Sequence, residues 1–394
     1  MTTKPDIDTS DFYAFEQMLD ADESSVLRAV HDFMTVEVDP IVNAHWERAT
    51  FPFEVVPGFR ALGIAGVPYR GYGCPGRSFL LDGMIAMELA RTDSSIATFN
   101  GVHGGLAMGS IYLCGSDEQR ERFLPAMARY DKIGSFGLTE PDVGSGASGG
   151  LMTTAERRGD TWILNGKKKW IGNATFGDLT VIWARDVADG QVKGFVVENS
   201  TPGFTAEKQE HKIALRIVQN ALITLDNVVV REEDRLQHAD SFRDTAEVLR
   251  MTRAGVAWMA VGCARGAYEN ALRYACSREQ FGRPIGGFQL VQDLLVRMLG
   301  NVTSSLALCT RLAQLQDQGL AEDRHSSLAK AFCTVRMRET VGWARELLGG
   351  NGILLEHNVG RFVADAEAIY SYEGTREMNT LIVGRSLTGL GAFV

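Results

Sequence analysis

Four short segments of the chain carry residue types that are unusual for a purely structural protein. Phe136–Asp142 (FGLTEPD) runs from apolar residues into a hydroxyl, an acid and a proline, ahead of a glycine-rich loop whose backbone amides suit phosphate oxygens. Trp170–Asn173 (WIGN) offers a flat indole for a planar ring, although a core tryptophan explains it equally well. Gly349–Gly352 (GGNG) is also explained as a helix stop. Tyr372–Thr375 (YEGT) places the Glu373 carboxylate beside a glycine, where the plain alternative is a solvated acid in a turn.

Two familiar motifs in the glycine-rich loop lack the structural context that their chemistry requires. Gly144–Gly149 fits GxGxxG, but a dinucleotide fingerprint needs a strand before it and a helix after it. Gly146–Gly150 fits GxSxG, but a nucleophile elbow needs a helix directly after the serine. We therefore interpret the segment as a surface loop. The seven histidines are scattered without an HExxH-type partner, so we expect no metal site.

Composition describes a folded protein of ordinary character. The chain has 394 residues, of which 45% are hydrophobic and 23% charged, which favours a water-soluble protein of two or three domains. The net charge of -9, without a long basic block, argues against nucleic-acid binding. The N-terminus lacks a signal-peptide pattern and no long apolar run occurs, so we expect no membrane insertion and a cytoplasmic location. Six cysteines lie far apart in the sequence, which favours reduced thiols.

The elements that must position these segments follow the order α, β, α. Only Pro284 follows Pro202, which leaves the last part of the chain free for long helices. Three-and-four spacing of apolar residues predicts helices over 242–275, from 291 to a cap at Gly319, and over 321–348, with earlier helical patterns at 25–37 and 80–91. Strands are predicted at 179–185, 194–198 and 221–230, and a hairpin at 162–170 around an Asn165–Gly166 turn. These patterns indicate an N-terminal helical domain (1–133), a middle β domain (134–238) and a C-terminal helical bundle (239–394).

Taken together and in order, the chemical segments resemble the acyl-CoA dehydrogenase family. The matching strings are FGLTEPDVGS (136–145), KKWIGN (168–173), SREQFGRPIGGFQ (277–289), ELLGGNGI (346–353) and YEGTREMNTLIVGR (372–385). The resemblance runs across nearly the whole chain and is strongest to the subgroup of glutaryl-CoA dehydrogenases and plant short-chain acyl-CoA oxidases. It implies an α+β fold with an N-terminal α domain, a middle β-barrel-like domain and a C-terminal four-helix bundle. It also implies a homotetramer, or at minimum a dimer, with FAD bound between subunits.

The resemblance implies which residues hold the flavin and the substrate. The residues expected along the flavin are Phe136, Leu138, Thr139, Gly144, Ser145, Trp170, Ile171 and Gly172. Those expected to reach its pyrophosphate and adenosine part from the next subunit are Arg278, Gln289, Gly349, Gly350 and Gly352, with Thr375 and Phe393 completing the pocket. Ser145, Arg253 and Gly374 match positions that contact the CoA thioester.

Glu373 matches the catalytic base of the family. A carboxylate removes the weakly acidic α-hydrogen of a thioester only when the carbonyl oxygen is stabilised, here by the Glu373 amide and a ribityl hydroxyl of FAD, and the base is desolvated. The β-hydrogen then leaves as hydride to flavin N5. Some relatives carry the base at the position before Arg253, but Thr252 stands there, so Glu373 is the expected base.

Three positions depart from the family's patterns. Ala97 stands where glutaryl-CoA dehydrogenases have an arginine for the distal carboxylate, which argues against glutarate as substrate. Gly172 replaces the threonine or serine of most dehydrogenases, as in the plant oxidases, and Gly146 replaces a common aspartate. We therefore expect an acyl-CoA dehydrogenase of short, uncharged acyl groups that passes electrons to an electron-transfer flavoprotein. An acyl-CoA oxidase that uses oxygen and a glutaryl-CoA dehydrogenase remain the alternatives, and a binding protein without dehydrogenation is disfavoured by Glu373.

Overall fold

The computed structural model describes residues 10–392, and its first part is helical. Its helices are α1 (Ala21–Phe33), α2 (Asp39–Arg48), α3 (Val56–Leu62), α4 (Phe79–Thr92), α5 (Ser94–Asn100), α6 (Met108–Cys114) and α7 (Asp117–Ala128), with π-helical segments η3 (Met34–Val38) and η5 (Gly101–Ala107) and a small β1 (Arg70–Gly71) and β2 (Cys74–Pro75) ladder. Side chains of Asp20, Ser78, Asp93 and Ser116 accept hydrogen bonds from the first-turn amides of α1, α4, α5 and α7. The helical patterns predicted at 25–37 and 80–91 are thus confirmed.

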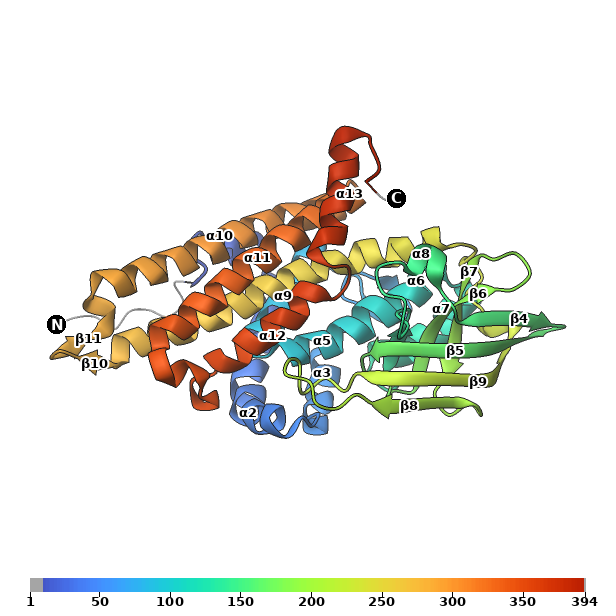
Figure 1. Cartoon of the computed structure of the whole chain (residues 1–394), viewed down its shortest axis with the longest axis horizontal. Helices are drawn as coiled ribbons and strands as arrows, with labels where there is room; N and C mark the ends of the chain where they lie inside the picture. The colour runs from blue at the N-terminus through green and yellow to red at the C-terminus, as the bar shows by residue number, and fades with distance from the viewer. Residues whose placement is uncertain (1–9, 393–394) are drawn as a thin grey trace.

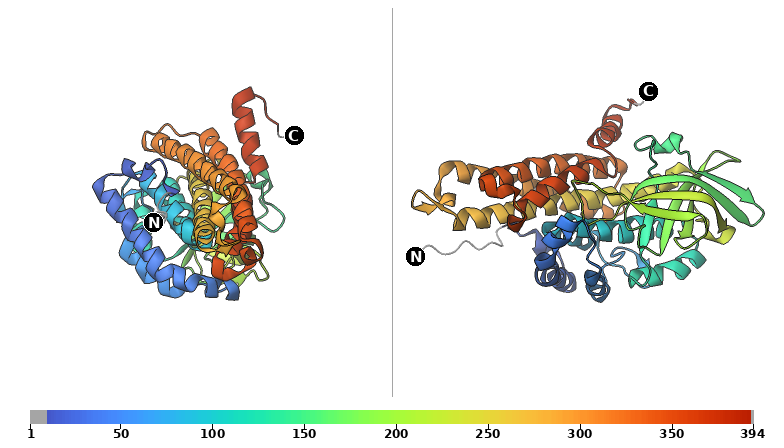
Figure 2. Two further views of the ribbon diagram at one scale, coloured as in Figure 1. Left: turned by 90° about the vertical axis from the view of Figure 1, so that its left-hand side faces the viewer. Right: turned by 60° about the horizontal axis from the view of Figure 1, so that its bottom comes forward.

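The middle part is a sheet that lies at one end of the long helices (Figures 1 and 2). Its strands are β3 (Gly134–Gly137), β4 (Thr154–Arg158), β5 (Thr161–Ile171), β6 (Leu179–Asp186), β7 (Val192–Glu198), β8 (Phe204–Lys208) and β9 (Ala221–Arg231). They follow the order β3-β6-β4-β5-β9-β8, with β7 paired to β6. Alternate residues of β5 and β9 are buried and build a separate apolar core in this half-barrel. The three predicted strands at 179–185, 194–198 and 221–230 are confirmed.

The hairpin predicted at 162–170 is wrong. Residues Thr161–Ile171 form the single strand β5, and the turn lies one step earlier, at Gly159 and Asp160 between β4 and β5. An Asn-Gly hairpin turn requires positive φ at both residues, whereas only Gly166 has it here, at 148°. The pairing of β5 with β9 is irregular at this point, and the Asn165 Oδ1 accepts the Asn227 amide hydrogen at 2.8 Å. The Asn-Gly pair therefore makes a bulge within a strand rather than a turn.

Three long helices dominate the C-terminal part. They are α9 (Phe242–Ser277), α10 (Gln289–Asp317) and α11 (Asp323–Leu348), which confirms the three helices predicted from the proline-free spacing. A short β10 (Glu279–Gln280) and β11 (Arg283–Pro284) ladder joins the first two, and η8 (Gly349–Ile353) ends the third. The shorter α12 (Val359–Ser371) packs against α9 and α11, and α13 (Arg376–Thr388) projects from the body (Figure 1). The fold is the predicted helical, β and helical arrangement, and the exact domain boundaries remain predictions.

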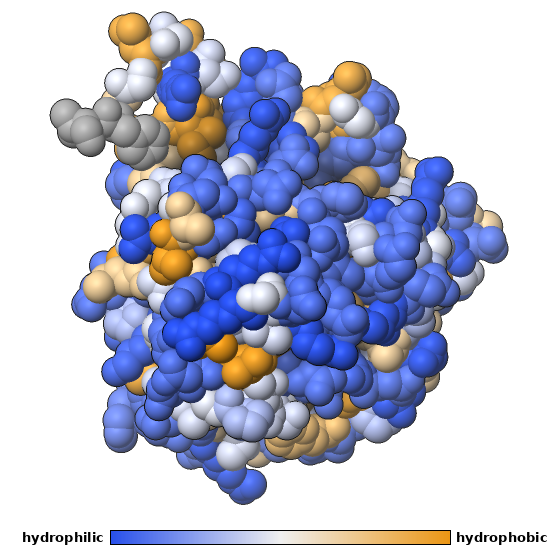
Figure 3. Space-filling model, turned by 90° about the vertical axis from the view of Figure 1, so that its right-hand side faces the viewer, coloured by the Kyte–Doolittle hydropathy of each residue, from blue (hydrophilic) through white to orange (hydrophobic). Residues whose placement is uncertain are grey.

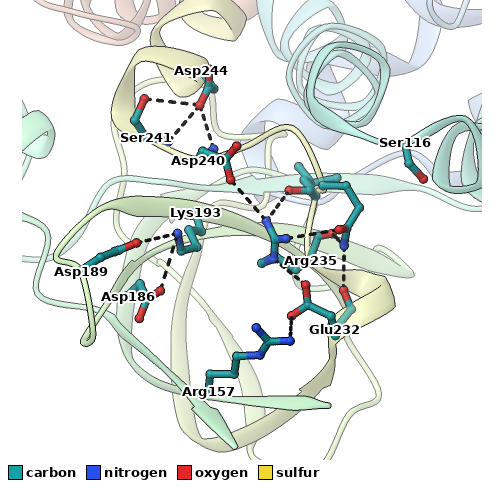
Figure 4. Close-up of polar contacts among 12 residues, drawn as sticks. Ser116, Arg157, Asp186, Asp189, Lys193, Glu232, Arg235, Asp240, Ser241 and Asp244 are labelled. Atoms are coloured by element: carbon teal, nitrogen blue, oxygen red, sulfur yellow. Dashed lines mark hydrogen bonds and ion pairs between the residues drawn. The ribbon is translucent and has the colours of Figure 1, made fainter. Parts of the chain in front are cut away.

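A polar joint fixes the sheet onto the beginning of α9 (Figure 4). Arg235, in the connection between β9 and α9, pairs with Glu232 at 3.0 Å and with Asp240 at 3.7 Å. The Gln119 side chain of α7 donates to the carbonyl oxygens of Glu233 and Arg235. Asp244 accepts from the Ser241 amide and closes a capping box at the N-terminus of α9. These contacts orient the sheet relative to the helix that carries Thr252.

None of the helices within residues 10–392 combines the length and the apolar character required to cross a membrane. Cys114, Cys263, Cys309 and Cys333 are buried free thiols, whereas Cys276 is exposed and Cys74 is partly so.

Candidate active site

A cavity lies between the helical parts, and Glu373 forms part of its wall. The carboxylate is carried by the short connection between α12 and α13, and the opposite walls come from α4, α5, η5 and α9. Glu373 has a left-handed backbone conformation with a φ of 51°, which a non-glycine residue adopts only where its surroundings hold it.

The Glu373 carboxylate has one direct partner among the described residues. The Thr252 hydroxyl on α9 lies 2.6 Å from its Oε2 atom and donates a hydrogen bond to it. Burial raises the pKa of Glu373, and this hydrogen bond together with the charges of Arg253 and Lys330 opposes that rise. A desolvated carboxylate of raised pKa is a stronger base than a solvated one once it is ionised.

Two side chains hold the connection that carries Glu373. Lys330, fully buried on α11, donates to the carbonyl oxygens of Tyr370 at 2.8 Å and Gly374 at 2.6 Å. Asn379 donates to the Gly374 carbonyl at 2.9 Å. Gly374 has a φ of 87°, and a Cβ there would lie 3.3 Å from the Asn379 amide, so glycine fits both the conformation and the space. Glu373 is thus held both by the hydrogen bond from Thr252 to its side chain and by the hydrogen bonds to the backbone next to it.

The expected substrate residues occupy different surroundings. Arg253 follows Thr252 on α9, and its Nε atom is buried without a hydrogen-bond partner in the described part of the chain. A Cβ on Gly374 would lie 3.9 Å from this Nε atom, so Arg253, Gly374 and Glu373 are brought together. Ser145 is exposed in the glycine-rich loop and does not line the Glu373 cavity.

Most residues that line the cavity are apolar, and several of them are small. Gly101, Gly104 and Gly105 of the π-helical η5 line it, together with Ala97 of α5 and Trp258 and Met259 of α9. Because these three glycines have no side chains, the η5 side of the cavity leaves room for a ligand between η5 and α9. Within the described residues, no lysine, arginine or histidine lines the cavity.

The two segments expected along the flavin are adjacent in the structure. The Lys169 amide donates to the Thr139 carbonyl at 2.8 Å. Lys168, fully buried, donates to the Leu138 carbonyl at 3.0 Å and pairs with Glu140 at 2.9 Å. Burial works against the Glu140 charge, yet the neighbouring ammonium and amide donors lower the pKa of Glu140. This buried pair ties the end of β3 to the end of β5.

Trp170 and Gly172 stand at the edge of this joined segment. Trp170 is 53% exposed, so the structure excludes the alternative of a core tryptophan. Phe136, Leu138 and Ile171 are buried beneath the segment, whereas Gly144 and Ser145 are exposed. A Cβ on Gly172 would lie 3.1 Å from Val102 of η5, the same π-helical segment that lines the Glu373 cavity. Gly172 and the Glu373 carboxylate are therefore both close to η5.

The remaining expected flavin residues lie at the far end of α9. Arg278 follows the last residue of α9, Gln289 begins α10, and the Asn351 side chain of η8 donates to the Tyr274 hydroxyl at 2.9 Å, which brings Gly349, Gly350 and Gly352 to the same end. Arg278 is 26 residues beyond Thr252 in the chain. At 1.5 Å per residue along α9, this separation is about 39 Å. The Thr375 hydroxyl accepts from the Met378 amide and caps α13, and Phe393 lies outside the described residues.

Sequence reasoning missed three residues that shape the site. Thr252 entered it only as a position without a carboxylate, and its hydrogen bond joins residues 121 positions apart. Lys330 was not singled out, although its helical spacing to Cys333 and Met337 places it on a buried face. Asp82, which lines the cavity from α4, was also not singled out.

Comparisons with known proteins find one family along nearly the whole chain. Three family models match: the acyl-CoA dehydrogenase N-terminal domain at residues 20–131, its middle domain at 135–228 and its C-terminal domain at 242–388. An acyl-CoA dehydrogenase of Bacillus subtilis (strain 168) is 32% identical over 92% of this chain and 97% of its own.

Solved structures give the same result. Two structures of glutaryl-CoA dehydrogenase from Mycobacterium smegmatis, one in complex with FADH2, superpose with TM-scores of 0.94 at 40% and 36% identity, covering 98% of this chain and 99% of theirs. An electron transferring flavoprotein structure of Acidaminococcus fermentans matches with a TM-score of 0.90 at 28% identity, covering 94% of this chain and 98% of that chain. With its fold and its three domain matches in agreement, the chain belongs to the acyl-CoA dehydrogenase family of FAD-dependent oxidoreductases.

Proposed function

We propose that this enzyme dehydrogenates a short, uncharged acyl-CoA thioester to the 2-enoyl-CoA, with Glu373 as the base that removes the α-proton. The supporting observation is the Glu373 carboxylate, desolvated, hydrogen-bonded to Thr252 and facing a cavity with small apolar walls. No other glutamate lines this cavity among the described residues.

The surrounding residues serve the base in distinct ways. Thr252 holds the carboxylate orientation, and Lys330 with Asn379 fixes the backbone on which it stands. The Glu373 amide belongs to the same clamped connection and is proposed to donate to the thioester oxygen as negative charge develops there. Gly374 and Arg253 are proposed to border the thioester, because both lie beside Glu373. Ser145, on the exposed glycine-rich loop, is proposed to approach the CoA part.

The residues at the sheet edge fit a flavin. An exposed indole at Trp170, backed by the Phe136–Thr139 segment, provides a flat apolar wall for a ring system. Gly144 and Gly146 have open space around their Cα atoms, which allows backbone amides of the loop to approach phosphate oxygens. FAD, when bound, accepts the hydride that leaves the β-carbon. This chain's part is to hold the acyl group between that ring and the Glu373 carboxylate.

A complete cofactor site is proposed to need a second copy of the chain. The Gly172 end of the Trp170–Asn173 segment lies against η5 beside the Glu373 cavity, whereas Arg278, Gln289 and Gly349–Gly352 lie about 39 Å along α9 from Thr252, farther than one extended dinucleotide reaches. Large hydrophobic residues near those far-end positions are exposed, with Phe281 at 93% and Leu290 at 82%. Others gather on the projecting C-terminal segment, above an otherwise mostly hydrophilic face (Figure 3). A homotetramer, or at minimum a dimer, satisfies both observations.

An electron-transfer flavoprotein is the proposed electron acceptor, as the family resemblance implies. The alternative, an oxidase that uses oxygen, is favoured by one observation, the glycine at position 172 in place of a hydroxyl-bearing residue. Val102 packs against Gly172 and fills part of the space that a side chain would take, so this position is less open than the sequence suggested.

Anaerobic titration of the FAD-loaded protein tests the proposal. Butyryl-CoA is expected to bleach the flavin absorbance with formation of crotonyl-CoA. Readmission of air separates the two acceptors, because an oxidase recovers its absorbance within turnover time and yields peroxide. An FAD-loaded protein that no saturated acyl-CoA ester bleaches would contradict the proposal.

A further inference from the structure

Asp82 places a second carboxyl group in the wall of the Glu373 cavity. It lies in the first turn of α4, beside Gly83, and lines the cavity together with Gln316 from the last turn of α10. Neither the Asp82 carboxylate nor the Gln316 side-chain amide has a hydrogen-bond or ion-pair partner among residues 10–392. The charged group that acts on Asp82 is Asp317, which itself accepts from the Phe79 amide at 2.7 Å.

An acid without a partner in a mainly apolar cavity is costly to ionise, because burial removes water from it. Burial, with the charge of Asp317, raises the pKa of Asp82 to about 7. A hydroxyl group both donates and accepts, so it satisfies the Asp82 carboxyl group in either of its protonation forms. A carboxylate at the end of the acyl chain has no hydrogen to donate to ionised Asp82, and its negative charge is unfavourable beside Asp317.

Asp82 stands away from the base, toward the distal part of the cavity. A Cβ on Gly83 would meet the Trp258 indole at 2.2 Å, so this turn of α4 is pressed against Trp258. Trp258 follows Thr252 by six positions in α9, about 9 Å along the helix. Thr252 binds Glu373 and Trp258 packs on the turn that carries Asp82, so the two carboxyl groups lie beside turns of α9 that are about 9 Å apart, a separation on the scale of a short acyl chain.

On this basis we propose that the distal end of the cavity recognises a hydroxyl group on the acyl chain, with Asp82 as its principal partner and Gln316 as a second. The inference rests on the proposed function, because it names the acyl group that the Glu373 site takes. Asp82 then acts as a specificity residue: it stabilises a hydroxyacyl chain and disfavours both an unsubstituted methyl end and a distal carboxylate.

A purely structural role for Asp82 is the competing explanation. An acid in the first turn of a helix interacts favourably with the helix dipole, and this alone is worth a fraction of the folding free energy. Glu118 also lies in the first turn of a helix, α7, but it is exposed and does not line the cavity, so Glu118→Gln is a matched control for that effect.

The test compares the FAD-loaded enzyme on pairs of esters of equal length: 4-hydroxybutyryl-CoA with butyryl-CoA, 5-hydroxypentanoyl-CoA with pentanoyl-CoA, and 6-hydroxyhexanoyl-CoA with hexanoyl-CoA. For at least one length, kcat/KM is expected to favour the hydroxyacyl ester by about tenfold or more, as one hydrogen bond to an acid provides. Asp82→Leu is expected to remove or invert this ratio, whereas Asp82→Asn, which keeps an acceptor oxygen, retains part of it. Glu118→Gln is expected to leave the ratio unchanged.

Two results would overturn the inference while leaving the proposed function intact. One is an enzyme that oxidises butyryl-CoA and shows no hydroxyacyl preference at any of the three lengths. The other is a preference that survives Asp82→Leu in a variant whose flavin content and thermal unfolding match the wild type. A protein whose flavin no ester bleaches would instead refute the proposed function itself.

Discussion

Replacing Thr252 by valine tests how the structure tunes its base. The Thr252 hydroxyl has one hydrogen and three oxygen neighbours: the Glu373 carboxylate at 2.6 Å, the Val248 carbonyl at 3.3 Å and the Leu249 carbonyl at 3.4 Å. The shortest and most strongly accepting partner is the carboxylate, so the hydrogen bond favours the ionised form of Glu373. Valine keeps the shape of the side chain and removes this donor.

The size of the effect follows from the hydrogen bond. A bond to a charged group contributes about 1.5 to 3 kcal/mol, and one pKa unit corresponds to about 1.36 kcal/mol. Thr252→Val is therefore expected to raise the pKa of Glu373 further, by the free energy of the lost hydrogen bond. Since only the ionised base accepts a proton, the acidic limb of the pH–rate profile moves upward by the same amount, and the rate recovers at high pH.

Stopped-flow measurement of anaerobic flavin reduction by butyryl-CoA across pH provides the assay, with Thr252→Ser as the matched control that keeps the donor. The serine variant is expected to retain the wild-type limb. An acidic limb that does not move in Thr252→Val, in a variant that binds FAD and substrate normally, would refute the assignment of Glu373 as the base or of Thr252 as its partner.

Three further predictions concern the walls and the support of the same site. Glutaryl-CoA is expected to be a poorer substrate than butyryl-CoA by about 1 to 3 kcal/mol or more in transition-state stabilisation, because its carboxylate meets Ala97 and no cation in the described cavity wall. Comparable kcat/KM for the two esters, with release of carbon dioxide from glutaryl-CoA, would contradict this. Gly172→Thr is expected to slow reoxidation of the reduced enzyme by oxygen without changing the reductive step. Because Val102 lies 3.1 Å from the added Cβ, the variant is best combined with Val102→Ala, and equal stopped-flow oxygen rates in all variants would remove Gly172 from the argument. Lys330→Met removes the donor to the Tyr370 and Gly374 carbonyls and is expected to lower the free energy of unfolding by about 1 to 3 kcal/mol and to lower kcat. Calorimetry beside the exposed control Lys167→Met checks it, and equal unfolding temperatures of the two variants would show that the clamp is not needed.

Periodicity and proline placement were enough to predict the helical parts of this fold. The ends of α9, α10 and α11 fall within a few residues of the predicted ranges, because long amphipathic helices repeat their pattern many times. The Asn165–Gly166 dipeptide misled because its local preference for a turn competes with the pairing of β5 to both β4 and β9. The hydrogen bonds of β5 to two neighbouring strands stabilise the extended conformation more than the dipeptide favours a turn.

The site was predictable only where its residues lie in one continuous string. Glu373, Trp170 and the Phe136–Ser145 segment could be named from the sequence because the family resemblance is carried by such strings. Thr252 and Lys330 act through contacts with elements far away in the chain, and a threonine or lysine in a helix carries no local sign of its partner. In the sequence, Asp82 is indistinguishable from any acidic residue in the first turn of a helix, and only the structure shows that it lines the cavity.

The central claim, that Glu373 is the base of an acyl-CoA dehydrogenase, is tested most directly by one single-turnover measurement. FAD-loaded wild type and Glu373→Gln are mixed anaerobically with butyryl-CoA, and crotonyl-CoA is quantified after quenching while ester binding is measured in parallel. The wild type is expected to form close to one equivalent per flavin, and Glu373→Gln, which binds the ester but cannot accept the α-proton, is expected to be slower by several orders of magnitude. Retention of more than a few per cent of the wild-type rate by Glu373→Gln would place the base elsewhere and contradict the account.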